Sequence, residues 1–166
     1  YMQGSIIDPY NQNVLKGDYP IIGKDIFFRL TGRDQTLFEG RQIPTPTTPF
    51  EATRNQGSAE FFGDPDQYFF AQNHSLSFEF FQGSSSFKPM DWRVKTTFIY
   101  NLNHLVADEL AIVSPDVRDG QSRFRQDFTM EEWFVEAKLL DTSPTYDFAS
   151  ARVGSQFFTS DFRGFI

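Results

Sequence analysis

The sequence predicts an all-β fold made of antiparallel amphipathic strands. Apolar and polar side chains alternate with a period of two over several segments, which is the pattern of a strand with one apolar and one polar face. Aromatic residues make up 17% of the 166 residues, yet the mean hydropathy is only −0.43. A chain is aromatic without being hydrophobic overall when its apolar residues alternate with polar ones along strands.

The first alternating segment covers residues 24–31. Residues 32–34 combine glycine and aspartate, which predicts a turn, and residues 36–42 then form a returning strand. The apolar face of the first segment consists of Ile26, Phe28 and Leu30.

Residues 43–72 are predicted to be a long loop. Prolines and glycines recur in it and oppose any regular element. Loops longer than about a dozen residues are uncommon in compact domains and tend to be functional. Its aromatic rings are too many to leave in water, so we expect the loop to fold back onto the protein or to grip a partner. These rings belong to Phe61, Phe62, Tyr68, Phe69 and Phe70.

A short strand is predicted at residues 74–81, and the clearest alternation follows in residues 92–104. A strand of about eleven residues matches a tilted membrane-spanning strand, whereas the usual globular strand has about five or six. Trp92 and Tyr100 lie at or near its ends, where an interfacial aromatic girdle would place them.

Residues 128–141 fit two patterns. A helix is favoured by a capping box formed by Thr129 and Glu132, and a strand is favoured by the alternation around Trp133. A short link containing Pro144 joins this segment to a last alternating strand at residues 147–157, and a hairpin would align the two. We therefore predict a strand.

Composition excludes several classes of protein. The net charge of −7 lacks the basic footprint of a nucleic-acid binder, and the absence of cysteine removes disulfide and thiol chemistry. No segment approaches the roughly 18 apolar residues of a membrane helix, and the first residues do not resemble a signal peptide.

No catalytic, cofactor or metal site is predicted. The only histidines, His74 and His104, are expected to be solvated at strand ends. Glu131 and Glu132 are adjacent, and adjacent strand residues point to opposite faces, so they cannot flank one bond. The acidic segment 64–66 lacks the remaining ligands of a calcium loop and is expected to form a turn.

The remaining candidate is a polar face shared by several strands. In a soluble sandwich this face would be the solvated exterior, whereas in a membrane barrel it would line a watery lumen. Strand length, and too few strands to enclose so many rings, favour the barrel. The lumen-facing candidates are Arg29, Glu79, Arg93, Lys95, Glu136, Lys138, Arg152 and Gln156, and the lipid-facing or girdle candidates are Trp92, Val94, Phe98, Tyr100 and Trp133.

Several segments together resemble a family of uncharacterised Gram-negative outer-membrane β-barrel proteins that are porin-like, of the alginate-export type. These segments are "DPYNQNVLKGDYPIIG", "GSAEFFG", "SFKPMDW", "RVKTTFIYNLN" and "YDFASARVGSQFFTSDFRGFI". The resemblance implies that residues 1–166 are a single domain forming the N-terminal part of a larger outer-membrane barrel with long loops. It implies no catalytic residues.

Two functions are therefore expected as alternatives. The first is an outer-membrane, porin-like protein that passes polar solutes or serves as a structural component of the envelope, with outer-membrane lipid, other envelope subunits or further copies of itself as partners. The second is a secreted or periplasmic all-β binding module, whose aromatic loop contacts carbohydrate or protein.

Overall fold

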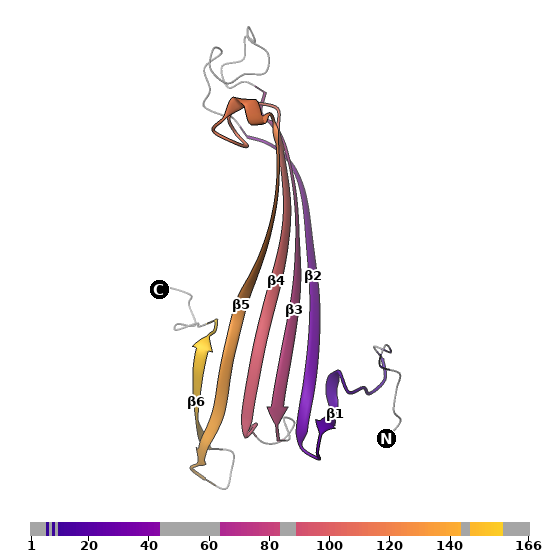
Figure 1. Cartoon of the computed structure of the whole chain (residues 1–166), viewed down its shortest axis with the longest axis vertical. Coiled ribbons are helices and arrows are strands. Elements are labelled where there is room, and N and C mark those ends of the chain that lie inside the picture. The colour runs from indigo at the N-terminus through magenta and orange to yellow at the C-terminus, as the bar shows by residue number, and fades with distance from the viewer. Residues whose placement is uncertain are drawn as a thin grey trace. The chain divides into compact units, whose positions relative to one another are not determined.

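The computed structural model describes Ile6, Asp8 and residues 10–43, 64–83, 89–143 and 147–157. These residues have an all-β fold, in which one antiparallel sheet contains the strands in chain order from β1 to β6 (Figure 1). The elements are β1 (Lys16–Ile22), β2 (Ile26–Gln42), β3 (Asp66–Gln82), β4 (Trp92–Ala107), the single-turn 3-10 helix η1 (Val117–Asp119), β5 (Ser122–Asp141) and β6 (Phe148–Ser155). In this described part, no helix is long and apolar enough to cross a membrane.

Strand β2 runs without interruption through the position of the predicted turn. It has 17 residues, so the turn at residues 32–34 and the separate returning strand were wrong. The real turn lies earlier, at Gly23, whose φ of 64° is the left-handed conformation that glycine adopts readily. Pairing with β3 holds Asp34 in the strand, where it accepts bonds from Gln72 and His74. Cross-strand pairing thus overrides the local turn preference.

Strand β3 begins earlier than expected. Its first residue is Asp66, so residues 66–72 are strand and the predicted loop 43–72 was too long. Tyr68, Phe69 and Phe70 are therefore strand residues and not loop anchors. At the other end of the connection, the Ile43 amide donates to the Pro65 carbonyl at 2.9 Å. Residues 44–63, which include the rest of the predicted loop with Phe61 and Phe62, lie outside the described residues.

The ambiguous segment at residues 128–141 is a strand, as predicted. It belongs to β5, which has 20 residues and pairs in antiparallel register with β6. The register places Glu136 opposite Arg152 and Phe134 opposite Gly154. The expected hairpin between residues 128–141 and 147–157 is thus confirmed.

The chain divides into two compact units. The first unit comprises Tyr1–Arg33, Ser75–Ile99 and Thr129–Ile166. The second unit comprises Asp34–His74 and Tyr100–Phe128. Each unit contains a part of the four long strands β2 to β5.

Candidate functional site

A chain of ion pairs crosses five strands of the first unit. Arg29 on β2 contacts Glu79 on β3 at 3.2 Å, and Glu79 contacts Arg93 on β4 at 3.5 Å. Arg93 reaches Glu136 on β5 at 2.6 Å, and Glu136 also binds Arg152 on β6 at 2.8 Å. Because directly opposed side chains on neighbouring strands lie close together, alternating charges at these positions attract one another. We call the face that carries these five residues the charged face.

Glu136 is the most highly connected carboxylate of this network. Its Oε2 atom accepts hydrogen bonds from two nitrogens of Arg93 and two of Arg152, and its Oε1 atom accepts from the Ser150 hydroxyl. Hydrogen bonds between charged groups are stronger than neutral ones. Glu136 therefore ties β4 to β6 through β5.

Two buried phenylalanine rings lie beneath the arginines of the charged face. Phe81 is 1% exposed and Phe134 is 3% exposed. The Arg29 guanidinium lies 5.3 Å from the centre of the Phe81 ring, and those of Arg93 and Arg152 lie 5.0 and 4.4 Å from that of Phe134. The arginines thus make cation–π contacts as well as ion pairs.

Close backbone packing completes the burial of both rings. Phe27 stacks on Phe81 at 5.4 Å, and a Cβ atom at Gly17 would lie 3.1 Å from the Phe81 ring, so β1 passes directly against it. Phe134 lies opposite Gly154, which has a φ of 146° and no side chain to compete for that space. Pairing an aromatic residue with a glycine on the next strand is a known way of stabilising a strand glycine.

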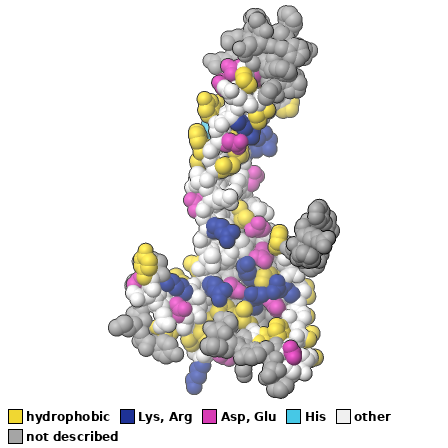
Figure 2. Space-filling model, turned by 180° about the vertical axis from the view of Figure 1, so that it is seen from behind, with side chains coloured by type: hydrophobic (Ala, Val, Ile, Leu, Met, Phe, Trp, Pro, Cys, Tyr) yellow, Lys and Arg dark blue, Asp and Glu magenta, His cyan; other side chains and the backbone are white. Residues whose placement is uncertain are grey.

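A second group of polar contacts lies beside the ion-pair chain. The Lys95 ammonium contacts the Glu132 carboxylate at 2.6 Å, and the Thr97 hydroxyl donates to the same carboxylate at 3.4 Å. The hydroxyls of Thr97 and Ser77 share a hydrogen bond of 2.8 Å. Lys138 contacts Asp91 at 3.1 Å. The charged face therefore holds most of its charges in fixed pairs, and Figure 2 shows acidic and basic side chains interleaved over the surface.

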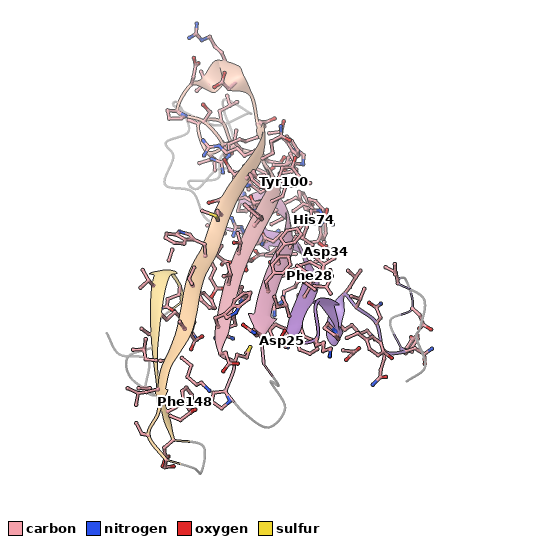
Figure 3. All side chains as sticks on the ribbon, turned by 60° about the horizontal axis from the view of Figure 1, so that its bottom comes forward. Asp25, Phe28, Asp34, His74, Tyr100 and Phe148 are labelled. Carbon is pink, nitrogen blue, oxygen red and sulfur yellow. The ribbon has the colours of Figure 1, made fainter. Side chains whose placement is uncertain are left out.

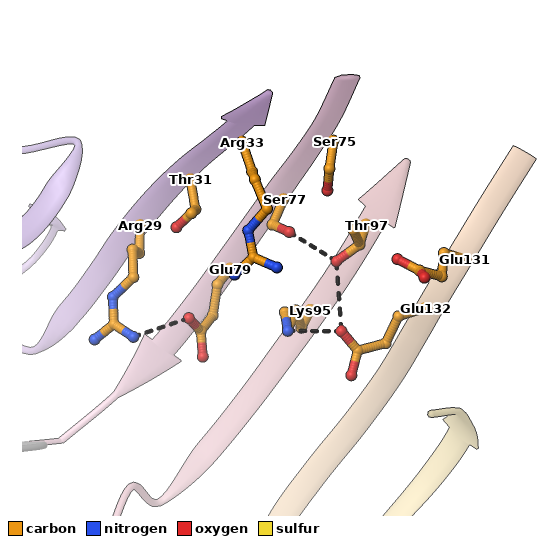
Figure 4. A pocket seen from close by; sticks show the side chains of 10 residues that line it. All are labelled: Arg29, Thr31, Arg33, Ser75, Ser77, Glu79, Lys95, Thr97, Glu131 and Glu132. Carbon is orange, nitrogen blue, oxygen red and sulfur yellow. Dashed lines mark hydrogen bonds and ion pairs between the residues drawn. The ribbon is translucent and has the colours of Figure 1, made fainter. Parts of the chain in front are cut away.

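A pocket of about 340 Å³ opens on the charged face (Figure 4). Among the residues that the structure describes, its lining consists of charged and hydroxyl side chains from four neighbouring strands. Its lining residues are Arg29, Thr31, Arg33, Ser75, Ser77, Glu79, Lys95, Thr97, Glu131 and Glu132. Such a lining suits a polar solute that exchanges hydrogen bonds with water for hydrogen bonds with the protein.

The pocket corrects one prediction about neighbouring carboxylates. Glu131 and Glu132 were expected to point to opposite faces of the strand, yet both side chains line this pocket. The two carboxylates therefore reach the same pocket although they are adjacent in β5. Adjacent strand residues reach one face when the regular pleat is broken, as at a bulge.

The opposite face of the first unit, which we call the apolar face, is rich in exposed hydrophobic side chains. Phe28 packs against Phe80 at 4.7 Å, and Phe78 packs against Phe98 at 6.2 Å. Large side chains on this face remain exposed: Leu76, Phe80, Val94, Trp133, Val135, Leu139 and Val153 have between 36% and 70% of their surface accessible. The Trp92 indole nitrogen donates a hydrogen bond to the Gln82 side chain at one end of the face.

The second unit holds a row of polar and aromatic side chains. His74 Nδ1 lies 3.1 Å from Asp34 Oδ1, and the His74 ring stacks on Tyr100 at 6.4 Å (Figure 3). The Tyr100 hydroxyl donates to Gln126 at 2.9 Å. His74 and His104 lie within β3 and β4, so the expectation that they flank strand ends was wrong for His74, which is in mid-strand. The longer strands account for this difference.

Acidic groups also gather in the second unit. Carboxylate oxygens of Asp64, Asp66 and Asp108 lie within 4.8 Å of one another. Asp66 accepts a hydrogen bond from Gln42 at 2.8 Å, and the buried Glu109 accepts one from the Asp64 amide. Carboxylates in this arrangement offer oxygen ligands to a hard cation, but hydrogen bonds within the protein already satisfy part of them.

The structure brings most of the predicted lumen-facing residues together. Seven of them lie in the first unit's ion-pair network or beside it, and Gln156 accepts a bond from Arg152 at 3.1 Å just beyond β6. Among the predicted apolar residues, Trp92, Val94, Phe98 and Trp133 belong to the first unit and Tyr100 to the second.

Sequence reasoning missed Phe81 and Phe134, together with Arg33 of the pocket. The sequence did contain a signal for the two rings, namely two pairs of adjacent aromatic residues, Phe80–Phe81 and Trp133–Phe134. Such a pair puts one ring on each face of a strand.

No protein-family model, curated protein or solved structure matches the chain.

Proposed function

We propose that the chain forms part of the wall of an outer-membrane β-barrel of the porin-like kind, which lets polar solutes pass along the charged face while the apolar face contacts lipid. The observation that carries this proposal is the exposed apolar face of the first unit. A soluble sheet buries its apolar face and exposes its charged one. Of the aromatic rings that the structure describes, the two most buried, Phe81 and Phe134, lie on the charged face, while Trp133 and Val135 are exposed.

The dimensions of the apolar face support the proposal. The first unit contains residues 26–33, 75–82 and 92–99 of β2, β3 and β4. Eight strand residues rise about 27 Å, so strands tilted by about 40° would cover about 20 Å, close to the apolar band of about 25 Å in bacterial barrels.

The ion-pair chain also supports it. The pairs hold long charged side chains against the wall: Glu79, whose side chain is 8% exposed, is compensated by Arg29 and Arg93. Arg29, Arg93 and Arg152 are each fixed by a carboxylate and a ring, which keeps the wall polar without filling the space beside it.

Tryptophan fluorescence tests lipid contact. The chain has two tryptophans, and Trp92 and Trp133 both belong to the apolar side of the first unit. In the variants Trp92→Phe and Trp133→Phe, the remaining tryptophan should be quenched in bilayers of brominated phosphatidylcholine and protected from aqueous iodide. Unbrominated lipid is the control. Strong iodide quenching without bromine quenching would contradict the proposal.

The depth of the two rings sharpens this test. Glu132 is bound by Lys95 and Thr97 of β4. The next residue, Trp133, therefore lies level with the part of β4 between Lys95 and Thr97, about four residues along the strand from Trp92. Four residues along a strand correspond to about 13 Å. The two tryptophans should therefore be quenched most strongly by bromines at different depths.

Solute passage is tested by conductance in planar bilayers. Lys95→Ala removes a positive charge from the charged face and should shift ion selectivity toward cations. Lys24→Ala removes the same charge from the exposed turn between β1 and β2 and is the matched control. Equal ion selectivity in Lys95→Ala and Lys24→Ala would contradict a lumen role for the charged face.

A further inference from the structure

The pocket on the charged face has a specific pattern of paired and unpaired charges. Glu79 is held by Arg29 and Arg93, and Lys95 is held by Glu132. Two charged residues of the lining are left: among the described residues, Arg33 and Glu131 take part in no ion pair. Within its described lining, the pocket therefore offers one free cation and one free anion.

These two free charges lie on opposite sides of the pocket. Arg33 is on β2 and Glu131 on β5, with β3 and β4 between them (Figure 4). Strands in a sheet are about 4.8 Å apart, so the two backbones are about 14 Å apart. The Arg33 side chain extends from β2 toward β3, and that of Glu131 projects from β5 into the pocket, which shortens this gap.

Hydroxyl groups occupy the floor between the two charges. Ser75, Ser77 and Thr97 come from β3 and β4, between the strands of Arg33 and Glu131, and the hydroxyls of Ser77 and Thr97 bond to each other (Figure 4). Hydroxyls both donate and accept hydrogen bonds, so they suit the amide or hydroxyl groups of a small solute. A ligand with a negative group at one end and a positive group at the other would satisfy both free charges at once.

We propose that this pocket binds a short zwitterionic solute, an amino acid or a dipeptide, with its carboxylate on the Arg33 guanidinium and its ammonium on the Glu131 carboxylate. The proposal deepens the proposed function and rests on it, because it names the class of solute that the charged face selects. Guanidinium pairs with carboxylate in a geometry that favours two parallel hydrogen bonds.

Binding to the refolded protein in detergent micelles tests the proposal, with diglycine as the probe. N-acetyl-diglycine lacks the positive end and diglycine amide lacks the negative end, while maltose represents neutral solutes. Isothermal titration calorimetry should give an affinity for diglycine about tenfold higher than for either capped peptide. Equal affinities for the three peptides, or binding of maltose without binding of diglycine, would overturn the proposal.

Charge exchange provides a second, independent test. Arg33→Glu and Glu131→Arg should each abolish the preference for diglycine, and the double variant should restore it because the two charges have only changed sides. Arg125→Gln and Asp127→Asn change exposed charges on β5 outside this pocket and should keep the preference. A preference that survives in Arg33→Glu would overturn the proposal.

The two proposals fail in different ways. Calorimetry in micelles needs no pore, so selective diglycine binding by a protein that shows neither conductance nor lipid quenching would contradict only the barrel. Conductance without selective diglycine binding would contradict only the zwitterion site.

Discussion

At the scale of single residues, Gly154 has the narrowest tolerance. A Cβ atom at this position would lie 2.1 Å from the Trp133 carbonyl oxygen and 2.6 Å from the Phe134 Cα atom, and the φ of 146° disfavours any side chain. We predict that Gly154→Ala lowers the free energy of unfolding by about 2 kcal/mol or more. Hydrogen exchange of β6 amides and urea unfolding of the refolded protein would measure this.

Gly32 provides the matched control for that substitution. It lies in β2 with ordinary backbone angles, and a Cβ atom there would meet nothing within 4 Å. Gly32→Ala should leave the free energy of unfolding within about 0.5 kcal/mol of the original. Equal losses in the two variants would show that the close approach at Gly154 does not matter.

Glu136 is the second residue whose loss has a defined cost. Glu136→Gln keeps the shape of the side chain but removes the charge shared by Arg93 and Arg152. We predict a loss of about 1 to 2 kcal/mol in the free energy of unfolding, because two guanidiniums lose their charged acceptor. The control is Glu39→Gln, whose partner Arg41 is 3.6 Å away in a half-exposed pair and which should change stability by less than about 0.5 kcal/mol. A loss at Glu136 no larger than at Glu39 would contradict a linking role.

At the scale of the strand, a substitution in β4 distinguishes a sheet whose apolar face contacts lipid from one whose apolar face contacts water. Val94 is 36% exposed on the apolar face, so in a soluble protein Val94→Arg would be almost neutral. Facing lipid, the same change should cost about 2 to 4 kcal/mol near the midplane. Unfolding in lipid vesicles would measure the difference.

The control for the strand experiment is an exposed valine away from the apolar face. Val117 in η1 is 46% exposed, and Val117→Arg should be tolerated under either interpretation. Tolerance of arginine at both valines would count against lipid contact along β4.

At the scale of the whole molecule, the open edges of the sheet set the behaviour. Within the described residues, β1 and β6 are the two end strands and do not pair with each other. Unpaired edge strands recruit further strands, and in lipid each unpaired backbone group costs several kcal/mol. We predict that the 166-residue chain associates through its edges and needs detergent to stay dispersed. Sedimentation in micelles should show association that increases with protein concentration, whereas a cooperatively unfolding monomer in plain buffer would refute this.

The features of the fold that the sequence determined by itself all follow from local periodicity. The alternation of period two was enough to predict the strand character of residues 74–81 and 92–104, because alternate side chains point to opposite faces of any strand. Residues 128–141 also fit a helix, and the short link to the next alternating segment decided for a strand. It also placed Arg93 and Glu136 on polar faces, where the structure pairs them.

What only the tertiary structure decided depends on contacts between strands. Gly32 lies inside β2 because the paired neighbour β3 continues beside it, and local turn preference cannot report that neighbour. Glu131 and Glu132 line one pocket although they are adjacent in β5, which the periodic pattern did not predict. Phe81 and Phe134 are buried on the charged face because Arg29, Arg93 and Arg152 come from other strands to cover them, and only the register of the assembled sheet brings those side chains together.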